Sequence, residues 1–402
     1  MEFRDIAALT QPSDRKVVLF VLDGLGGLPL ERGGPTELEA ARTPNLDELV
    51  RTGSCGLHEP VAAGITPGSG PGHLALFGYD PLVYQTGRGV LAALGVNFDL
   101  RPSDIAARGN FSTLADDGRV VDRRAGRIST EEATPLAEAL ARIQVDGARV
   151  YVQPVKEHRF LLVIRPDEPL EADLHDTDPG RTGEPPADPE AGGAGSRPAA
   201  EIVRRWLEAA RETLAGHPTA NMALLRGFST LPDWPRFEDV FGMRAFGAAA
   251  YPMYRGVAKL VGMTTVAVED DLGALGDALE GALDEFEFFF LHYKTPDKAG
   301  EDGDFDRKVA SLEAADGLVP RLVEANRGGV LLVTGDHSTP ASLRSHSWHP
   351  VPFLIHGGEG RADEARSFGE TECARGSLGL RRGCELMPLA AARALRLAKF
   401  GA

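Results

Sequence analysis

Two short apolar runs that each end in an acidic loop constrain the fold of this chain more than any other feature. Lys16 to Asp23 reads KVVLFVLD and is followed by GLGG, and Gly329 to Val333 runs into TGDHSTP. Runs rich in Val and Leu and bounded by turn residues predict buried strands. Val351 to His356 predicts a third strand, and a helical stretch opens at Thr43-Pro44-Asn45 and closes at Gly53. Strands that alternate with helices indicate an α/β fold with a parallel or mixed sheet.

The middle of the chain has a different character. From about Arg108 to Phe228, turn-rich segments surround two further strand-like runs, Arg149–Val155 and Phe160–Ile164. The tract from Asp176 to Pro198 is rich in Pro and Gly and poor in apolar residues, which predicts a long loop. Residues of metal-binding type lie on both sides of this block. We therefore predict a core domain of residues 1–107 and 251–402, split by an inserted domain at 108–250.

Length and composition limit the possible functions. At 402 residues the chain is long enough for two domains, and its net charge of −16 argues against nucleic acid as a partner. The first fifteen residues lack a signal peptide's apolar stretch, and no run approaches a membrane span. Three widely separated cysteines suit a reducing compartment. We expect a cytoplasmic protein that binds no membrane, and the sequence leaves its oligomeric state open.

A small hydroxyl side chain stands between two glycines in ITPGSGPGHLALFGYDP, residues 65–81. Ser69 precedes a helix-like stretch that we expect to begin near Gly72. A helix N-terminus favours an anion, and the flanking glycines let the backbone approach a ligand closely. Ser69 is therefore a candidate nucleophile, although the motif taken alone fits a turn with a Ser cap equally well.

Carboxylates and imidazoles that could bind metal occur at three places in the sequence, and each place also has a simpler structural interpretation. Asp23 follows a strand, where a capping role is the alternative. Asp297 and Glu301 lie four residues apart in a strongly acidic segment and would share one helix face, although such segments are commonly solvated surface. Asp336 and His337 follow a strand, with His346 close behind, in what could otherwise be a polar capping loop. Carboxylates with imidazoles suit Mn²⁺ or Zn²⁺, so these clusters predict two divalent ions beside one nucleophile.

Ten stretches in order along the chain support a family resemblance: LDGLG (22–26), ARTPNLDELVRTGSCG (41–56), PGSGPGHLALFGYDP (67–81), RGNFSTL (108–114), DRRAGR (122–127), EHRFLLV (157–163), LRGFS (225–229), YPMYRGVAKLVGM (251–263), KTPDKAGEDGD (294–304) and VTGDHSTPASLRSHSWHPVPFLI (333–355). With these the sequence resembles the cofactor-independent phosphoglycerate mutases of the archaeal type, in the alkaline phosphatase superfamily. The resemblance implies an alkaline-phosphatase-like α/β core, with a central mostly parallel sheet flanked by helices, and an inserted smaller α+β domain.

The resemblance also assigns roles to residues. Ser69 would become a phosphoserine as 3-phosphoglycerate and 2-phosphoglycerate interconvert in glycolysis or gluconeogenesis. One ion would be held by Asp23, Ser69, Asp336 and His337, and the other by Asp297, Glu301 and His346. The ions would be Mn²⁺, with Zn²⁺, Mg²⁺ or Co²⁺ as alternatives, and no 2,3-bisphosphoglycerate would be needed. The small phosphorylated acid would be gripped by Asn110, Arg123, Arg124, Arg127, Arg159, Arg226, Arg255 and Lys259, with Asp122 as an acid/base candidate.

The sequence departs from the family pattern at three positions. Glu301 stands where the family has a His ligand, Gly70 where it has an acidic residue, and Gly27 where an Asp is usual. Alternatives on the same scaffold are a metal-dependent phosphatase, a phosphonate hydrolase or a homoserine kinase-like phosphotransferase. A further alternative, from another class, is a metal-binding or regulatory protein that has lost catalysis, which the intact Ser69 and first ligand set argue against.

Overall fold

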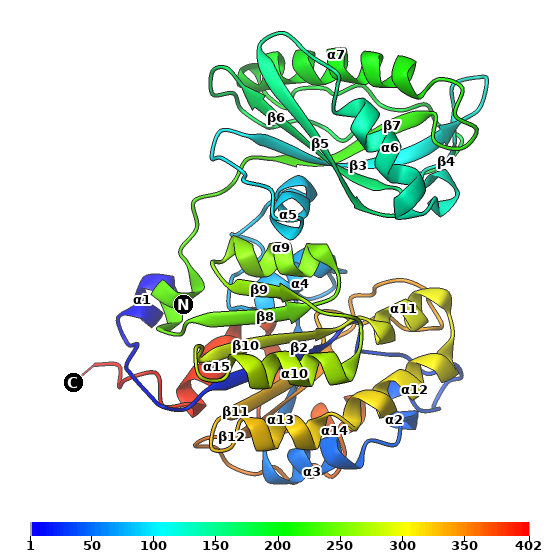
Figure 1. Cartoon of the computed structure of the whole chain (residues 1–402). Helices are drawn as coiled ribbons and strands as arrows, with labels where there is room; N and C mark the ends of the chain where they lie inside the picture. Colours follow the sequence, from blue (N-terminus) through cyan, green and yellow to red (C-terminus); the bar gives the residue numbers. More distant parts are fainter. Residues whose placement is uncertain (1, 402) are drawn as a thin grey trace. The chain divides into compact units, whose positions relative to one another are not determined.

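The structure, a computed structural model, describes residues 2–401. The chain divides into two compact units: a first unit formed by the chain up to Gln85 and from Trp234 onward, and an inserted unit, Thr86–Asp233. Figure 1 shows that each unit has its own sheet. This inserted unit begins before residue 108, the predicted start of the insertion, and ends before residue 250, its predicted end. Helix α5 (Arg88–Gly95) packs on strands of the inserted unit, while β8 (Ala245–Ala249) pairs with a strand of the first.

The first unit is built on an eight-stranded sheet with the order β13-β2-β12-β11-β1-β10-β8-β9. Besides β8, its strands are β1 (Val17–Leu22), β2 (Ser54–Glu59), β9 (Thr264–Ala267), β10 (Phe288–Tyr293), β11 (Val330–Thr334), β12 (Val351–Gly357) and β13 (Gly379–Arg382). All neighbouring pairs run parallel except β11–β12 and β12–β2. The predicted α/β class with a mostly parallel sheet is therefore confirmed.

Helices cover this sheet on both faces. Those of the first unit are α1 (Phe3–Ala7), α2 (Glu37–Ala40), α3 (Pro44–Thr52), α4 (Ser69–Leu76), α8 (Phe237–Phe241), α9 (Pro252–Leu260), α10 (Leu272–Ala282), α11 (Thr295–Asp302), α12 (Phe305–Asp316), α13 (Val319–Ala325), α14 (Glu370–Cys373) and α15 (Leu386–Arg393). Val18 and Phe20 of β1 join the core with α3, α10, α12 and α13. On the other face Phe290 of β10 contacts Phe77 and His73 at α4. Phe289 and Leu291, on either side of Phe290 in β10, belong to the first core, so alternate residues of this strand pack into opposite layers.

Local sequence explains these elements. All of β1 is buried, as its unbroken apolar run requires, since strands inside parallel sheets are covered on both faces. Helix α3 begins with Pro44 at its first position, buries Leu46, Leu49 and Val50, and ends before Gly53. The three predicted strands correspond to β1, β11 and β12. The helix expected near Gly72 instead begins at Ser69, with Gly68 as its N-cap.

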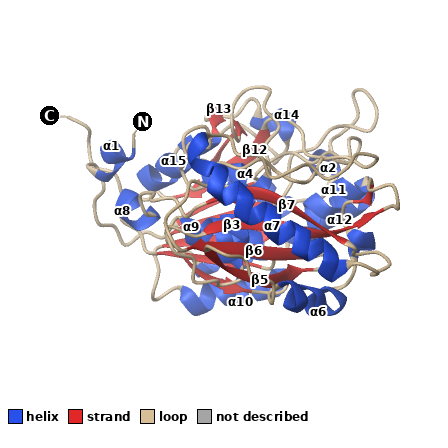
Figure 2. Ribbon diagram, turned by 90° about the horizontal axis from the view of Figure 1, so that it is seen from above, coloured by secondary structure: helices blue, strands red, loops and turns tan. Residues whose placement is uncertain are grey.

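The inserted unit is an α+β sandwich with one antiparallel sheet in the order β4-β3-β6-β5, in which β7 also pairs with β3. Its elements are β3 (Ile105–Leu114), β4 (Val120–Asp122), α6 (Thr130–Leu140), β5 (Ala148–Lys156), β6 (Arg159–Pro166), α7 (Arg197–Leu214) and β7 (Met222–Ser229). The long amphipathic helix α7 buries Trp206 against the sheet core. Figure 2 shows α7 lying across these strands.

The Pro/Gly-rich tract differs in part from its prediction. Residues 176–193 carry no helix or regular strand, as expected, but a short 3₁₀ turn (Ala194–Ser196) and the first turn of α7 occupy its end. Thr177 and Asp178 are buried, and Val120 exchanges backbone hydrogen bonds with Gly183 and Glu184. Polar contacts therefore pack a tract that has too few apolar residues to pack by burial. Among residues 2–401, no helix is both long enough and apolar enough to cross a membrane.

Candidate active site

Three neighbouring parallel strands bring the candidate ligands to one edge of the large sheet. Asp23 follows β1, Asp336 and His337 follow β11, and Asp297 lies in α11, directly after β10. This is the carboxyl edge, where α/β sheets bind ligands. Gly24 makes the close approach possible. It has a φ of +67°, and a Cβ there would lie 2.8 Å from the Cβ of Asp297.

A first cluster consists of Asp23, Asp336 and His337, all completely buried, with one ligand atom of each within 4.8 Å of the others. His337 Nε2 lies 3.1 Å from Asp336 Oδ2 and 3.5 Å from Asp23 Oδ1. Within the described part of the chain, these two carboxylate oxygens have no hydrogen-bond partner. Buried unpartnered oxygens are costly, so an arrangement that points them at an imidazole nitrogen fits a divalent ion.

Electrostatics prepare these groups as ligands. Burial alone would raise the pKa of Asp23, but the charges of Lys294 and His292 outweigh it and hold that pKa well below its usual range. Burial outweighs the charge of Asp336 and lowers the pKa of His337, which favours its neutral imidazole. An ionised carboxylate and a neutral imidazole are the forms that bind metal.

A second cluster consists of Asp297, His337 and His346. Asp297 Oδ1 lies 3.6 Å from His346 Nε2 and 3.9 Å from His337 Nδ1. His346 Nδ1 lies 3.0 Å from the carbonyl oxygen of Pro67, which leaves Nε2 directed at Asp297. The two clusters share His337, whose ring stacks on that of His346 at 3.6 Å.

Ser69 is the first residue of α4 and lies beside the first cluster. Its Oγ is 3.4 Å from His337 Nε2. Gly72, one turn along, is buried, and a Cβ there would overlap the carbonyl oxygen of Asp336. Glycine at this position lets the helix N-terminus approach the metal-type residues, where its free N–H groups favour a phosphoryl oxygen.

Three residues that the sequence analysis did not select support the site from behind. His292 Nε2 lies 2.9 Å from Asp23 Oδ2. His73 Nδ1 donates to the carbonyl oxygen of Ser69 at 2.8 Å and lies 3.2 Å from Asp336 Oδ2. Both imidazoles are buried, and they place a polar group behind each carboxylate. Lys294 is the third, and its Nζ contacts both Asp23 and Asp297. Burial lowers the pKa of Lys294, but the charge of Asp23 outweighs it and raises that pKa well above its usual range. His73 stands one helical turn after Ser69, a spacing that could have identified it.

Glu301 lies one turn after Asp297 in α11, but its side chain is exposed. Among residues 2–401, neither group of clustered metal-type side chains includes it. Asp297 and Glu301 therefore lie one turn apart in the same helix, as expected, but Asp297 is buried among the metal-type residues whereas Glu301 is exposed to solvent.

The departure at Gly27 has a structural explanation. A Cβ at Gly27 would overlap Oε2 of Glu37, a completely buried carboxylate. Glu37 accepts backbone hydrogen bonds from Leu28 and Ala341, and so joins the loop after β1 to the loop that carries His337. Glu37 thus fills the space that an acidic side chain at 27 would need. Gly70 is buried in the first turn of α4.

The inserted unit contains a cluster of arginines with acidic partners. Arg123 binds Asp178 through two hydrogen bonds of 2.7 and 2.9 Å, and Arg226 lies 3.6 Å from the same carboxylate. Arg159 Nη1 is 3.0 Å from Glu157. Burial, followed by the positive charges of Arg159 and other arginines nearby, lowers the pKa of His158 to about 3. At His158 the positive charges of these arginines therefore outweigh the charges of their acidic partners.

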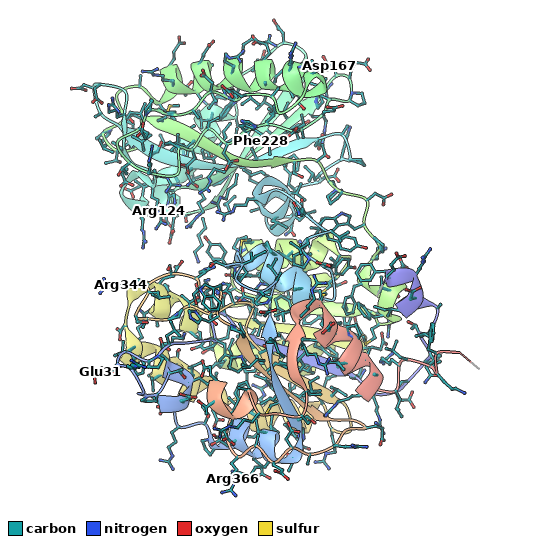
Figure 3. All side chains as sticks on the ribbon, turned by 180° about the vertical axis from the view of Figure 1, so that it is seen from behind. Glu31, Arg124, Asp167, Phe228, Arg344 and Arg366 are labelled. Atoms are coloured by element: carbon teal, nitrogen blue, oxygen red, sulfur yellow. The ribbon has the colours of Figure 1, made fainter. Side chains whose placement is uncertain are left out.

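The remaining candidates occupy varied environments. Asp122 accepts hydrogen bonds from the backbone of Arg124 and Gly126, and so caps the turn after β4. Arg124 and Arg127 are exposed, and Figure 3 shows Arg124 extending from the inserted unit. Asn110 is buried in β3. Arg255 and Lys259 belong to α9 in the first unit, and Arg255 Nη1 donates to the carbonyls of Ala249 and Ala250.

A mostly parallel sheet with clustered carboxylates and imidazoles at its carboxyl edge, in a chain that also carries an α+β insertion, defines an α/β protein with a candidate metal site. Residues 51–220 match the family model described as 2,3-bisphosphoglycerate-independent phosphoglycerate mutase. The chain is 50% identical to a probable 2,3-bisphosphoglycerate-independent phosphoglycerate mutase of Thermus thermophilus, over 100% of this chain and 99% of the relative. It is 48% identical to a protein of the same description from Deinococcus radiodurans, over 99% and 98%.

Solved structures agree with these relatives. A protein from Pyrococcus horikoshii superposes with a TM-score of 0.84 at 32% identity, covering 96% of this chain and 99% of that one. The cofactor-independent phosphoglycerate mutase from Thermoplasma acidophilum superposes with a TM-score of 0.68 at 29% identity, covering 94% and 100%. The chain belongs to the 2,3-bisphosphoglycerate-independent phosphoglycerate mutase family.

Proposed function

We infer that this chain is an enzyme that interconverts 3-phosphoglycerate and 2-phosphoglycerate in glycolysis and gluconeogenesis, in the cytoplasm and without 2,3-bisphosphoglycerate. The full-length similarity to relatives described as mutases of this kind supports the activity. One observation of the structure carries the mechanism. Ser69 Oγ lies at a helix N-terminus, 3.4 Å from His337 Nε2, beside the unpartnered oxygens of Asp23 and Asp336.

The donor sets fit two divalent ions. Asp23, Ser69, Asp336 and His337 would hold one, and Asp297 and His346 the other. Glu301 would complete the second set if its flexible side chain turned inward from the exposed position. Bound ions would stabilise a Ser69 alkoxide and neutralise phosphoryl oxygens. Mixed carboxylate and imidazole ligands favour Mn²⁺, with Zn²⁺, Mg²⁺ or Co²⁺ as alternatives.

Ser69 would act as the nucleophile. Its hydroxyl loses its proton to a base, and Oγ forms a bond to phosphorus while the bond from phosphorus to the 3-oxygen of the substrate breaks. The 3-oxygen takes up a proton, which leaves a phosphoserine and glycerate. The 2-hydroxyl of glycerate then loses its proton to a base and forms a bond to phosphorus while the bond from phosphorus to Ser69 Oγ breaks, and Oγ regains a proton. Water must be excluded while the phosphoserine exists, because hydrolysis would turn the cycle into a phosphatase reaction.

The arginine cluster of the inserted unit would bind the anionic groups of the substrate, since guanidinium forks match carboxylate and phosphate. The residues proposed for this are Asn110, Arg123, Arg124, Arg127, Arg159 and Arg226, with Arg255 and Lys259 from the first unit. Asp122 remains a candidate acid/base. Its hydrogen bonds to backbone N–H groups support a turn-capping role as well.

A coupled assay tests the activity. Purified protein with Mn²⁺ is given 3-phosphoglycerate and excess enolase, without 2,3-bisphosphoglycerate, while free phosphate is followed in parallel. We expect phosphoenolpyruvate without phosphate release, and no product from Ser69→Ala. Phosphate release alone would indicate a phosphatase, and the absence of both phosphoenolpyruvate and free phosphate would contradict the mutase function.

A further inference from the structure

One ammonium group spans the two clusters. Lys294 stands at the N-cap of α11, and its Nζ lies 3.1 Å from Asp23 Oδ2 and 2.6 Å from Asp297 Oδ2. Asp23 belongs to the first cluster and Asp297 to the second. Both carboxylates are completely buried, whereas the Lys294 side chain is 23% exposed.

Lys294 takes the same oxygen, Oδ2, of each carboxylate. This leaves Oδ1 of Asp23, which has no partner within the described residues, facing His337. It also leaves Oδ1 of Asp297 facing His346. An ion held by either Oδ1 would therefore share its carboxylate with a positive charge already in place.

Two physical effects of this arrangement act in opposite directions on ion binding. By fixing Oδ2, the lysine orients the ligand oxygens, and this favours binding. Its positive charge repels a divalent ion on the far side of the same carboxylate and removes part of the negative potential that attracts it. The repulsion acts in a buried site and involves a doubly charged ion. Orientation also has other sources, since His292 holds Asp23 and Thr339 holds Asp297. The charge effect therefore dominates.

We propose that Lys294 is a built-in cation of this site, which neutralises Asp23 and Asp297 when no ion is bound and thereby weakens the binding of divalent ions at both clusters. Two buried carboxylates close together would otherwise destabilise the ion-free protein. Lys294 thus keeps the ion-free site folded and makes its ions exchangeable. The inference rests on the two-ion site of the proposed function.

Calorimetric titration of ion-free protein with Mn²⁺ tests this proposal. The variants are Lys294→Met, Lys294→Arg, which retains the charge, and Lys298→Met. Lys298 is a matched control because it is an exposed lysine on the same helix. We expect Lys294→Met to bind Mn²⁺ at least tenfold more tightly than the unmodified chain, and its ion-free form to melt at a lower temperature. Lys294→Arg and Lys298→Met should keep the affinity of the unmodified chain more closely.

The outcomes distinguish an error in the proposed ion sites from an error in the role of Lys294. If the unmodified chain binds no Mn²⁺, the proposed ion sites are wrong, and the role of Lys294 falls with them. If it binds Mn²⁺ and Lys294→Met binds equally or more weakly, only the role of Lys294 is wrong. Should ion-free Lys294→Met fail to fold, competition between a chelator and the Mn²⁺-loaded variant gives the same affinity.

Discussion

Replacing Gly72 by Ala would test how closely α4 must approach the Asp336 loop. A Cβ at this position would overlap the Asp336 carbonyl oxygen and lie 3.1 Å from the Asp336 Cβ. Because non-bonded atoms pack at roughly 3.5 Å, helix or loop must retreat by about 1 Å. Overpacking of this kind costs about 1–3 kcal/mol. A displacement of about 1 Å between catalytic groups can lower the rate by about 100-fold.

The same substitution at Gly281 provides the control. Gly281 lies in α10, and a Cβ there would have no neighbour within 4 Å. Ala is a better helix former than Gly, so Gly281→Ala should stabilise the chain by about 0.5–1 kcal/mol. The same Gly→Ala change should therefore lower the free energy of unfolding in α4 and raise it in α10.

Urea unfolding followed by circular dichroism measures the free energies, and the enolase-coupled assay measures kcat. We expect Gly72→Ala to lose stability and about 100-fold in kcat, and Gly281→Ala to gain stability with unchanged kcat. Full stability and full kcat in Gly72→Ala would refute the packing argument, because the helix and loop would then have room that the structure does not show.

Three further substitutions test other parts of the account. Asp178→Asn weakens the two hydrogen bonds from the charged, partly exposed Arg123 and should cost about 2 kcal/mol in urea unfolding; an unchanged free energy would contradict a structural role for this pair. In the folded chain the pKa of His158 is about 3, against about 6.5 when unfolded, so the unfolded state binds a proton first as pH falls. The contribution of neutral His158 to the free energy of unfolding is therefore complete above about pH 6.5 and is lost as the pH falls toward 3. His158→Phe should reduce the difference between the urea midpoints measured at pH 7 and pH 5. Glu301→Ala should weaken the second Mn²⁺ at least tenfold in calorimetry, and equal affinity would remove Glu301 from the ligand set.

The sequence predicted the sheet and the residues at its edge for a clear physical reason. Unbroken apolar runs such as Lys16–Asp23 have few alternatives to a buried strand, and parallel strands bring the residues at their carboxyl ends to one edge. The groups behind that edge were not predicted. His73 and His292 look like ordinary core residues until the fold brings each next to a carboxylate. Lys294 looks like one more charge in an acidic segment.

Elements held by contacts between distant segments were also hard to predict. Helix α5 lies before the predicted insertion, but it packs on β3 and β7, which composition cannot reveal. Thr177 looked like part of a solvated loop, yet it is buried because its backbone N–H donates to Leu225 and its hydroxyl accepts from that residue's N–H. Such polar packing leaves no periodic pattern in the sequence.

The central claim is that the phosphoryl group passes through Ser69. Mn²⁺-loaded protein would be mixed with 3-phosphoglycerate, quenched in acid during turnover and analysed by peptide mass spectrometry. The account predicts one phosphoryl group on the peptide that contains Ser69, and none in Ser69→Ala. Turnover of 3-phosphoglycerate to 2-phosphoglycerate by the Ser69→Ala variant, or phosphate on a different residue of the active enzyme, would contradict it.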